Sequence, residues 1–316
     1  MIKPKILVSS CLLGNNVRYD GQNTLDRWLT DQLGKHFELV PICPELLMGM
    51  GVPREPVNLI LDQAGIVHMV SIKSKIDYTE KAHQVSEQIA SEYAHQIFGM
   101  ILQKKSPSCG VERVKLYNEK DEHMFNLKNS EKNRGLFAVH MMENFPMIPI
   151  IDSGRLYDNG EKENFLRQVM CYFRFKELDG SIKALQDFHA RYKFVIMEHH
   201  QDSMRKLGKI AANSHNDAPE LVYHNYASLL FSTLRKLPTV KARTNVFYHL
   251  IGFFKNELES SEKSIIHQMI SDYSQGLVPY LVPKKMLEFL INKHQQYYLK
   301  NHYYLDQFPK ELQIPR

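Results

Sequence analysis

The sequence has 316 residues, of which 43% are hydrophobic and 24% charged, and it carries a modest net charge of +5. This composition is ordinary for a soluble globular protein, and the length predicts two domains. The apolar run near the N-terminus is too short and strand-like for a signal peptide, and no stretch approaches the roughly 18 apolar residues of a membrane span. We therefore expect a cytoplasmic protein in which the four cysteines are reduced thiols.

The first half of the chain alternates between strand patterns and helix patterns. The helix prediction is clearest over 79–98, where Ala82, Val85, Ile89 and Ile97 lie on one face. In chain order we expect strands at 5–10, 37–42, 99–102 and 147–151, and helices at 79–98, 135–144 and 161–173. This alternation predicts an α/β domain over residues 1–178, with a mostly parallel, Rossmann-like sheet.

The second half has helical patterns and almost no strand signals. We expect an all-α domain over residues 179–316 that begins at the Asp179-Gly180 turn, with helices at 181–208, 218–236, 241–257, 260–275 and 283–300. Residues 179–316 contain 18 Lys and Arg against 13 Asp and Glu, whereas residues 1–178 contain 22 of each. The excess positive charge favours a polyanion as the partner of this half, although a charge of this size can also serve only solubility.

Three cysteines follow three of the predicted strands. Cys11 comes directly after the first strand, Cys43 directly after the second, and Cys109 a few residues after the third. In an open α/β sheet, ligands bind beyond the carboxyl ends of the strands, so we expect the three thiols to meet at that edge. Any one of them alone is as well explained as a buried core residue. Cys171 lies in an apolar helix pattern, and we interpret it as core packing.

Three thiolates from separate loops fit two kinds of metal site. One is a cubane iron–sulfur cluster with three cysteine-bound irons and one open iron. The other is a zinc ion with an open water position. The compact C-x-x-C spacing usual in zinc sites is absent, which favours the cluster weakly.

Polar groups next to the cysteines are candidates for catalysis. Glu45 lies two residues from Cys43, where it can activate water or donate a proton. Ser106 and Ser108 flank Cys109 and can hydrogen-bond a base carbonyl or a developing negative charge, or simply cap a turn.

A second group of residues near the same edge has the chemistry to bind a nucleotide. Tyr19 can stack on a base, Arg18 can hold a phosphate and Asp20 can read a base edge, unless Arg18 and Asp20 pair with each other. Arg54 is a candidate anion contact. Lys104 and Lys105 can bind phosphate, although solvated lysines are the simpler interpretation.

Taken together, these segments resemble the thiouracil desulfidase (TudS) family over residues 4–175. The resemblance rests on Cys11-Leu12-Leu13-Gly14, Arg18-Tyr19-Asp20-Gly21, Cys43-Pro44-Glu45, Pro53-Arg54-x-Pro56, Ser106-Pro107-Ser108-Cys109-Gly110, Gly154-Arg155-Leu156 and Glu163-Asn164-Phe165. It implies a [4Fe-4S] cluster held by Cys11, Cys43 and Cys109, with one iron open to a thiocarbonyl sulfur. It also implies non-redox hydrolysis of the C–S bond, with Glu45 activating water and Ser106 or Ser108 stabilising charge.

The second half resembles the YbgA-like domain. The matching residues include Phe188-His189-x-x-Tyr192-Lys193, Asn245-Val246-x-x-His249-x-x-Gly252-x-Phe254-Lys255 and Pro309-Lys310-Glu311-Leu312. Fusions of the two domains resemble tRNA 4-thiouridine desulfidases, which implies thiolated tRNA as the partner. The candidate residues for its backbone are Arg191, Lys193, Lys241, Arg243 and Lys255.

Three alternatives remain open from the sequence. The enzyme can act on free 2-thiouracil instead of tRNA. The same three thiolates can serve a zinc-dependent nucleobase hydrolase or deaminase. The chain can also be a non-enzymatic RNA-binding protein with a structural cluster.

Overall fold

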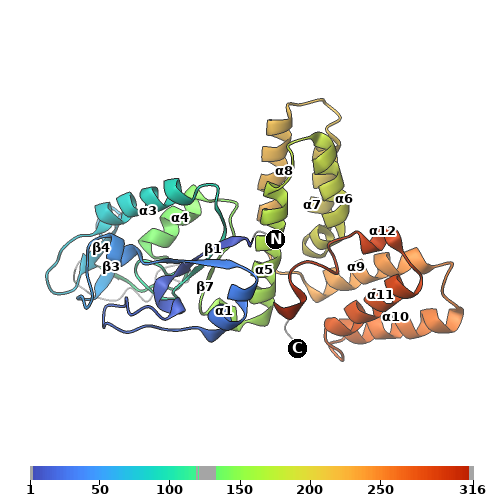
Figure 1. The fold of residues 1–316 in the computed structure, drawn as a ribbon, viewed down its shortest axis with the longest axis horizontal. Coiled ribbons are helices and arrows are strands. Elements are labelled where there is room, and N and C mark those ends of the chain that lie inside the picture. The colour runs from blue at the N-terminus through green and yellow to red at the C-terminus, as the bar shows by residue number, and fades with distance from the viewer. Residues whose placement is uncertain (1–2, 119, 121–132, 313–316) are drawn as a thin grey trace. The chain divides into compact units, whose positions relative to one another are not determined.

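The chain folds into two compact units, Met1–Phe165 and Leu166–Arg316 (Figure 1). The computed structural model describes residues 3–118, 120 and 133–312. Within these residues, none of the helices is both long enough and apolar enough to cross a lipid bilayer.

A four-stranded parallel sheet forms the centre of the first unit. Its strands are β1 (Lys5–Ser9), β2 (Glu38–Ile42), β5 (Ile97–Leu102) and β7 (Ile150–Asp152), in the order β2-β1-β5-β7. The side chains of Ile6, Leu7 and Val8 in β1 are fully buried, as expected for a parallel strand covered on both faces. The predicted α/β domain with a mostly parallel sheet is confirmed.

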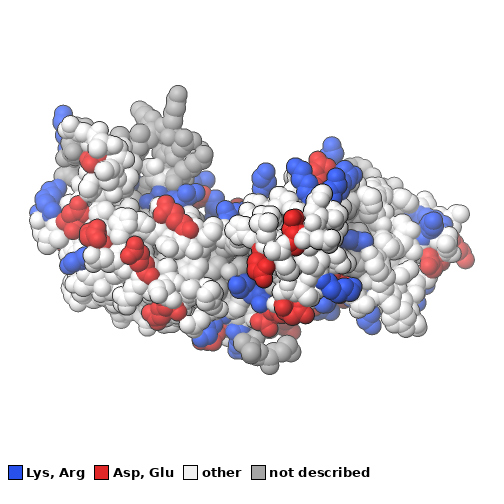
Figure 2. Space-filling view, turned by 90° about the horizontal axis from the view of Figure 1, so that it is seen from above, with Lys and Arg blue, Asp and Glu red and all other residues white. Residues whose placement is uncertain are grey.

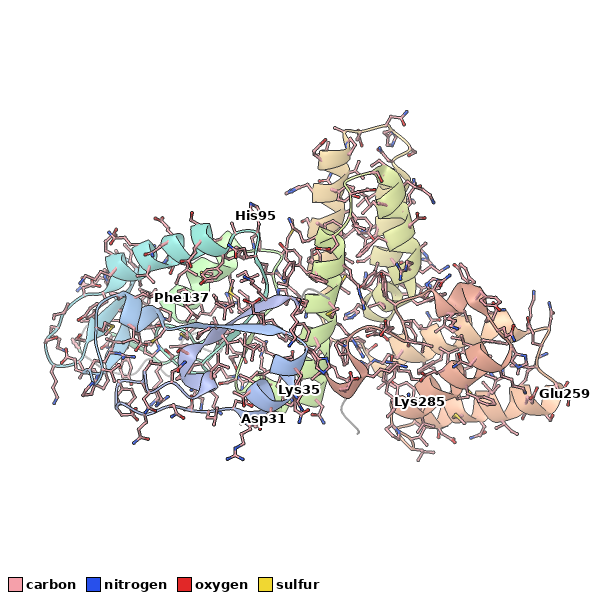
Figure 3. The ribbon with its side chains drawn as sticks, in the orientation of Figure 1. Asp31, Lys35, His95, Phe137, Glu259 and Lys285 are labelled. Carbon is pink, nitrogen blue, oxygen red and sulfur yellow. The ribbon has the colours of Figure 1, made fainter. Side chains whose placement is uncertain are left out.

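Helices cover this sheet. Helices α3 (Thr79–Tyr93) and α4 (Leu136–Asn144) lie side by side over it (Figure 1), and Phe137 of α4 lies inside the unit (Figure 3). The predicted helix over 79–98 ends early, and Ile97 belongs to β5 instead. Ile97 pairs with Lys5 of β1 and is buried there, so the strand ladder overrides the helical spacing.

A second, three-stranded sheet was not predicted from the sequence. It contains β3 (Val57–Leu61), β4 (Val67–Ser71) and β6 (Leu116–Asn118), in the order β4-β3-β6. Strands β3 and β4 form an antiparallel hairpin, in whose turn Gly65 has a φ of 84°. The β3–β4 hairpin is local in the sequence and its turn glycine could have indicated it, whereas the parallel pairing of β3 with the distant β6 has no local signal.

The second unit is helical, as predicted. Helix α5 (Asn159–Lys176) leads into it, and α6 (Ile182–His199), α7 (Gln201–Ala212), α8 (Pro219–Leu234), α9 (Val240–Ile251), α10 (Ser260–Ser274), α11 (Leu281–Lys293) and α12 (Tyr297–Lys300) follow. The single helix predicted over 181–208 is two helices. His200 is extended between them, and its Nδ1 accepts a hydrogen bond from the backbone N–H of Ser203, which caps α7.

The two units divide inside α5, earlier than the Asp179-Gly180 turn that was expected to separate them. The reason lies in the last turns of the helix. The ring of Phe175 packs 5.5 Å from that of Phe188, and Arg174 donates a hydrogen bond of 3.1 Å to the hydroxyl of Tyr192. The end of α5 is therefore part of the helical core.

A buried ion-pair network lies in the core of the second unit. The Glu198 carboxylate is 0% exposed and accepts a hydrogen bond of 3.2 Å from Arg167, and Arg243 lies 3.9 Å away. Tyr280 donates a hydrogen bond to the same carboxylate. Burial by itself raises the pKa of Glu198, but the two arginines outweigh it and lower the pKa below its usual value.

We expect Glu198→Gln to destabilise the helical unit by about 3–5 kcal/mol, because two arginines stay buried without a counter-charge. The measurement is urea unfolding followed by far-UV circular dichroism. Trp28, the only tryptophan, belongs to the first unit, so its fluorescence transition should not move. Glu220→Gln, at an exposed position of α8, is the matched control.

The stability lost in Glu198→Gln should depend on pH. Because the folded-state pKa of Glu198 is lowered, its contribution is complete above the unfolded value of about 4.3 and is lost as the pH falls through the folded value. The stability gap between the wild type and Glu198→Gln should therefore narrow in acid. Equal free energies of unfolding for the wild type and Glu198→Gln at neutral pH would contradict a stabilising role of the ion-pair network.

Candidate active site

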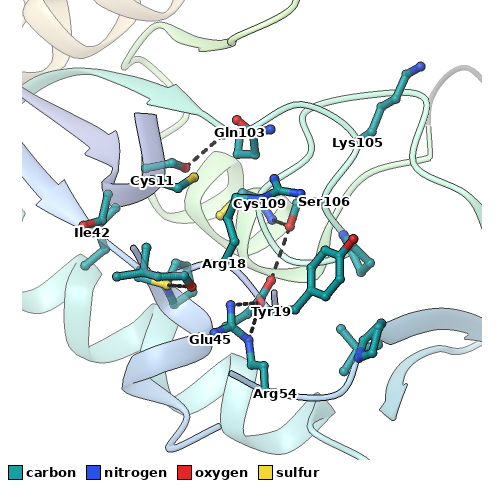
Figure 4. Close-up of a pocket in the computed structure, with 18 of the residues that line it drawn as sticks. Cys11, Arg18, Tyr19, Ile42, Glu45, Arg54, Gln103, Lys105, Ser106 and Cys109 are labelled. Atoms are coloured by element: carbon teal, nitrogen blue, oxygen red, sulfur yellow. Dashed lines mark hydrogen bonds and ion pairs between the residues drawn. The ribbon is translucent and has the colours of Figure 1, made fainter. Parts of the chain in front are cut away.

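Three thiols meet at the carboxyl edge of the parallel sheet. Cys11 lies in a 3-10 helix (Ser10–Leu13) directly after β1, and Cys43 follows β2 and precedes the short helix α2 (Pro44–Leu47). Cys109 lies in the loop after β5. All three line one cavity of about 340 Å³ (Figure 4). The predicted convergence of the three cysteines is therefore present in the structure.

The environment of the three thiols is largely apolar. Burial raises the pKa of Cys11 and Cys43, and raises that of Cys109 to about 12. Cys11 also contributes to the shift at Cys43, and Cys43 to that at Cys109, so the three groups lie within electrostatic reach of one another. Cys171 is fully buried in the second unit, in line with its interpretation as core packing.

The donor set fits a metal group that binds thiolates. Buried thiols with raised pKa values stay neutral unless a nearby positive charge compensates them, and a bound metal supplies that charge. Within the described part of the chain, no three His, Cys, Asp or Glu side chains are grouped as ligands of a single metal ion. The three cysteines thus share a cavity without forming a single-ion site.

A carboxylate in the cavity is held by an arginine. Arg54 donates from Nε to Oε2 of Glu45 over 2.9 Å, and a second guanidinium nitrogen contacts the same oxygen (Figure 4). Its third nitrogen donates to the carbonyl of Gly51 over 2.9 Å. The side chains of Arg54 and Glu45 are 5% and 15% exposed. Arg54 was expected to contact a substrate anion, and in the structure its guanidinium is bonded to Glu45 and Gly51.

Only one of the two candidate serines, Ser106 and Ser108, lines the cavity. Ser106 lines the cavity and donates to Oε1 of Glu45 over 3.4 Å. Its hydroxyl also accepts from the backbone N–H groups of Ser108 and Cys109, which fixes the turn. Ser108 is fully buried, with its hydroxyl 3.5 Å from the Cys109 sulfur, and it does not line the cavity. Of these two serines, Ser106 is therefore the one that lines the cavity.

Glycines allow other segments to pack closely on the Cys109 loop. A Cβ atom at Gly135 would lie 2.3 Å from the carbonyl oxygen of Ser108, and one at Gly110 would lie 2.4 Å from the side chain of Val114. The first turn of α4 binds this loop, because Leu136 and Ala138 donate backbone hydrogen bonds to Pro107 and Ser108. The loop that carries Cys109 is thus fixed by backbone contacts on both sides.

The loop after Cys11 contributes two side chains to the cavity. Arg18 and Tyr19 line it, and the Arg18 guanidinium lies 5.5 Å from the centre of the Tyr19 ring. Asp20 was predicted to read a base edge, but it does not line the cavity. Its carboxylate accepts from the backbone N–H of Gln22 and lies 3.6 Å from Arg18, because it closes the turn of its own loop.

The predicted RNA contacts divide between the two units. Lys104 and Lys105 line the cavity of the first unit. In the second unit Lys241 and Lys255 are exposed, whereas Arg243 is buried against Glu198 and cannot reach an RNA backbone.

The other two predicted RNA contacts, Arg191 and Lys193, form hydrogen bonds within the second unit. Arg191 donates to the carbonyl of Asn301, and Lys193 donates to the hydroxyl of Tyr298. On the face shown in Figure 2, basic and acidic side chains are interspersed.

Several cavity residues were missed from the sequence. Ser9, Ser10 and Gln103 all line it. The backbone N–H of Gln103 donates to the Ser9 hydroxyl over 2.9 Å, and the Gln103 side-chain carbonyl accepts from Thr24 and Ser153. All three residues lie at the ends of β1 and β5, so the strand-end argument that found the cysteines could also have found them.

Comparisons with known proteins find relatives for both halves of the chain. The family model of 2-thiouracil desulfurase matches residues 6–153, and that of a protein of unknown function (DUF1722) matches residues 193–309. The chain is 28% identical to the uncharacterized protein YbgA of Escherichia coli (strain K12) over 142 residues, which are 45% of this chain and 84% of YbgA.

Two further similarities concern the first unit. A solved structure described as the [4Fe-4S]-dependent thiouracil desulfidase TudS has 30% sequence identity and a TM-score of 0.38, and the match covers 49% of this chain and 95% of that one. The uncharacterized protein YbbK of Bacillus subtilis (strain 168) is 35% identical over 112 residues, which are 33% of this chain and 72% of YbbK. With its three cysteines at one sheet edge, the chain belongs to the 2-thiouracil desulfurase family, to which a DUF1722 region is joined.

Proposed function

We propose that this protein is a desulfidase that hydrolyses the C–S bond of a thiolated uracil, and that its substrate is 4-thiouridine in tRNA. The observation that carries the proposal is the cavity that is lined by three thiols, two of them buried and one half-buried, and by one arginine-held carboxylate. Membership of the 2-thiouracil desulfurase family supports the reaction class.

In this proposal Cys11, Cys43 and Cys109 hold a [4Fe-4S] cluster. Such a cluster, when bound, supplies an iron without a protein ligand that attracts the soft thiocarbonyl sulfur and makes the ring carbon electrophilic. The three sulfur donors and their shared cavity suit a thiolate-bound group of this kind.

Glu45 is the proposed general base. Its carboxylate is fixed by Arg54 through one oxygen and by Ser106 through the other, so it lies in the cavity in a single orientation. From there it takes a proton from the water that attacks the ring carbon and returns one to the departing sulfur. The water oxygen becomes the new carbonyl oxygen and hydrogen sulfide leaves, so no oxidant or reductant is consumed.

Two residues that line the cavity orient the nucleobase of the substrate. Tyr19 and Arg18 line the cavity beside Glu45, and the exposed Tyr19 ring can stack on a pyrimidine. The single hydroxyl hydrogen of Ser106 is donated to Glu45, so Ser106 stabilises an oxygen that develops negative charge when this hydrogen turns from Glu45 toward that oxygen.

The proposal of tRNA as the substrate rests on charge and on the second unit. The excess of basic over acidic residues lies entirely in residues 179–316. Lys241 and Lys255 are exposed there and can contact phosphates. A nucleotide within tRNA must leave its stack to enter the cavity, at a cost of a few kcal/mol.

The test is an anaerobic assay of the full chain after cluster reconstitution, with 2-thiouracil and thiolated tRNA as parallel substrates. We expect 4-thiouridine to disappear from the tRNA and sulfide to appear in equal amount. Turnover of 2-thiouracil alone would overturn the tRNA proposal and leave the desulfidase. Unchanged tRNA and unchanged base with an intact cluster would overturn the enzyme proposal. Zinc without iron in the purified protein would indicate the hydrolase alternative.

The cysteine assignment predicts a clear pattern among alanine variants. Cys11→Ala, Cys43→Ala and Cys109→Ala should each lose the visible absorption and the iron of the reconstituted protein, since each removes one of three ligands. Cys171→Ala is the matched control and should keep both, because Cys171 is buried in the helical unit. Loss of iron in Cys171→Ala, or full iron in any of the other three, would contradict the assignment.

Substitution of Glu45 should lower kcat more than substitution of Arg54. Glu45→Gln should lower kcat by about 10²–10⁴-fold with iron content unchanged, because it removes the base and preserves the shape. Arg54→Gln should lower kcat by about 10- to 100-fold with little change in KM, because the carboxylate remains but is no longer oriented.

Glu38→Gln, at an exposed position of β2, is the matched control for these two variants. An Arg54→Gln enzyme that loses substrate affinity and keeps kcat would show that Arg54 contacts the substrate after all.

A further inference from the structure

An exposed aromatic ring lies just outside the cavity. Tyr157 ends the 3-10 helix Arg155–Tyr157, which follows β7, and it is 75% exposed. It does not line the cavity and has no role in the chemistry proposed above. A ring with this exposure contributes little to packing, and its faces are accessible to a ligand.

The segment that carries this ring is fixed by hydrogen bonds. The Asp152 carboxylate accepts from the backbone N–H groups of Gly154 and Arg155, over 2.8 and 3.0 Å. Arg155 in turn donates to the carboxylate of Glu112 over 3.1 Å. The backbone N–H of Tyr157 donates to the carbonyl of Gly154, so the ring is presented on a fixed turn.

Lys104 connects this ring to the cavity. Lys104 lines the cavity, and its backbone N–H donates to the hydroxyl of Ser153 over 3.1 Å. Its aliphatic stem passes close to Gly154, where a Cβ atom would lie 3.1 Å from the Lys104 Cδ. The ammonium group then lies 5.9 Å from the centre of the Tyr157 ring. The cavity rim therefore presents a lysine charge and an aromatic face next to each other.

These two groups match the two parts of a nucleotide. An aromatic ring stacks on a base of any identity, and an ammonium group pairs with a phosphate. A free base bound inside the cavity would use neither, because it has no phosphate and no neighbouring base. The arrangement is therefore useful only for a substrate whose chain continues beyond the reacting base.

We propose that Tyr157 stacks on the nucleotide next to the reacting one while Lys104 holds the phosphate between them, so that this rim selects polynucleotide over free base. The inference deepens the proposed desulfidase function and rests on it for the identity of the reacting base. It names a specificity-determining pair, Tyr157 and Lys104, in addition to the residues that face the ring carbon.

The test is equilibrium binding of a short single-stranded RNA with one central 4-thiouridine to the full chain, measured by fluorescence anisotropy over a range of salt concentrations. Tyr157→Ala should weaken binding by about 5- to 100-fold at every salt concentration, and Tyr157→Phe should restore it. Lys104→Ala should weaken binding and also lower the slope of log K against log salt by about 0.7, because one phosphate contact is lost. Ile66→Ala, which removes an exposed apolar side chain at the β3–β4 turn, is the control.

A second measurement separates this inference from the proposed function. In the reconstituted enzyme, the ratio of kcat/KM for the RNA to kcat/KM for free 4-thiouracil should fall in Tyr157→Ala by the same factor as binding. RNA binding that is unaffected by Tyr157→Ala, equally weak binding of Tyr157→Phe, or no binding of RNA by the wild type would each overturn the inference. If the wild type desulfurates neither substrate, the proposed function fails, and the binding series still decides the role of Tyr157.

Discussion

The parallel pairing of β1 with β2 on one side and β5 on the other is the constraint on which the site depends. The register aligns Ser9 with Ile42 and Val8 with Ile101, so the segments that follow the three strands leave the sheet at one edge. Cys11 and Cys43 lie one or two residues beyond this aligned edge, and Cys109 reaches it on a loop fixed by the first turn of α4. Three thiols far apart in the sequence then share one cavity because backbone hydrogen bonds, which do not depend on side chains, align the strands.

The cysteine thiols and the Glu45 carboxylate at this edge have different electrostatic surroundings. The three thiols are buried in surroundings that disfavour the thiolate, so a positively charged metal group is needed to keep them ionised. The carboxylate of Glu45 carries its own counter-charge in Arg54. Arg54 also donates to the carbonyl of Gly51, so its guanidinium is held between the carboxylate and the backbone.

The second unit also contains a carboxylate that is held by arginines. Glu198 is fully buried and carries Arg167 and Arg243 as partners, with the Tyr280 hydroxyl as an additional donor. Such networks are costly to desolvate and costly to break, so they fix one packing of the helices around them. The basic residues available to a nucleic acid are therefore those outside this core. The rim residues Lys104 and Tyr157 belong to the first unit, so the proposed recognition of a polynucleotide involves the first unit as well as the second.

The sequence by itself determined the α/β class of the first half, the helices of the second, and the three cysteines that meet at a strand edge. These follow from periodicity and from the rule that parallel strands align their carboxyl ends, both of which are local or topological. The tertiary structure alone decided that Arg54 holds Glu45, that Ser106 and not Ser108 faces the cavity, that Asp20 closes its own turn, and that Arg243 is buried. It also decided the second sheet and the division inside α5. The physical reason is that side-chain direction and pairing between distant segments depend on packing, which no local pattern of residues records.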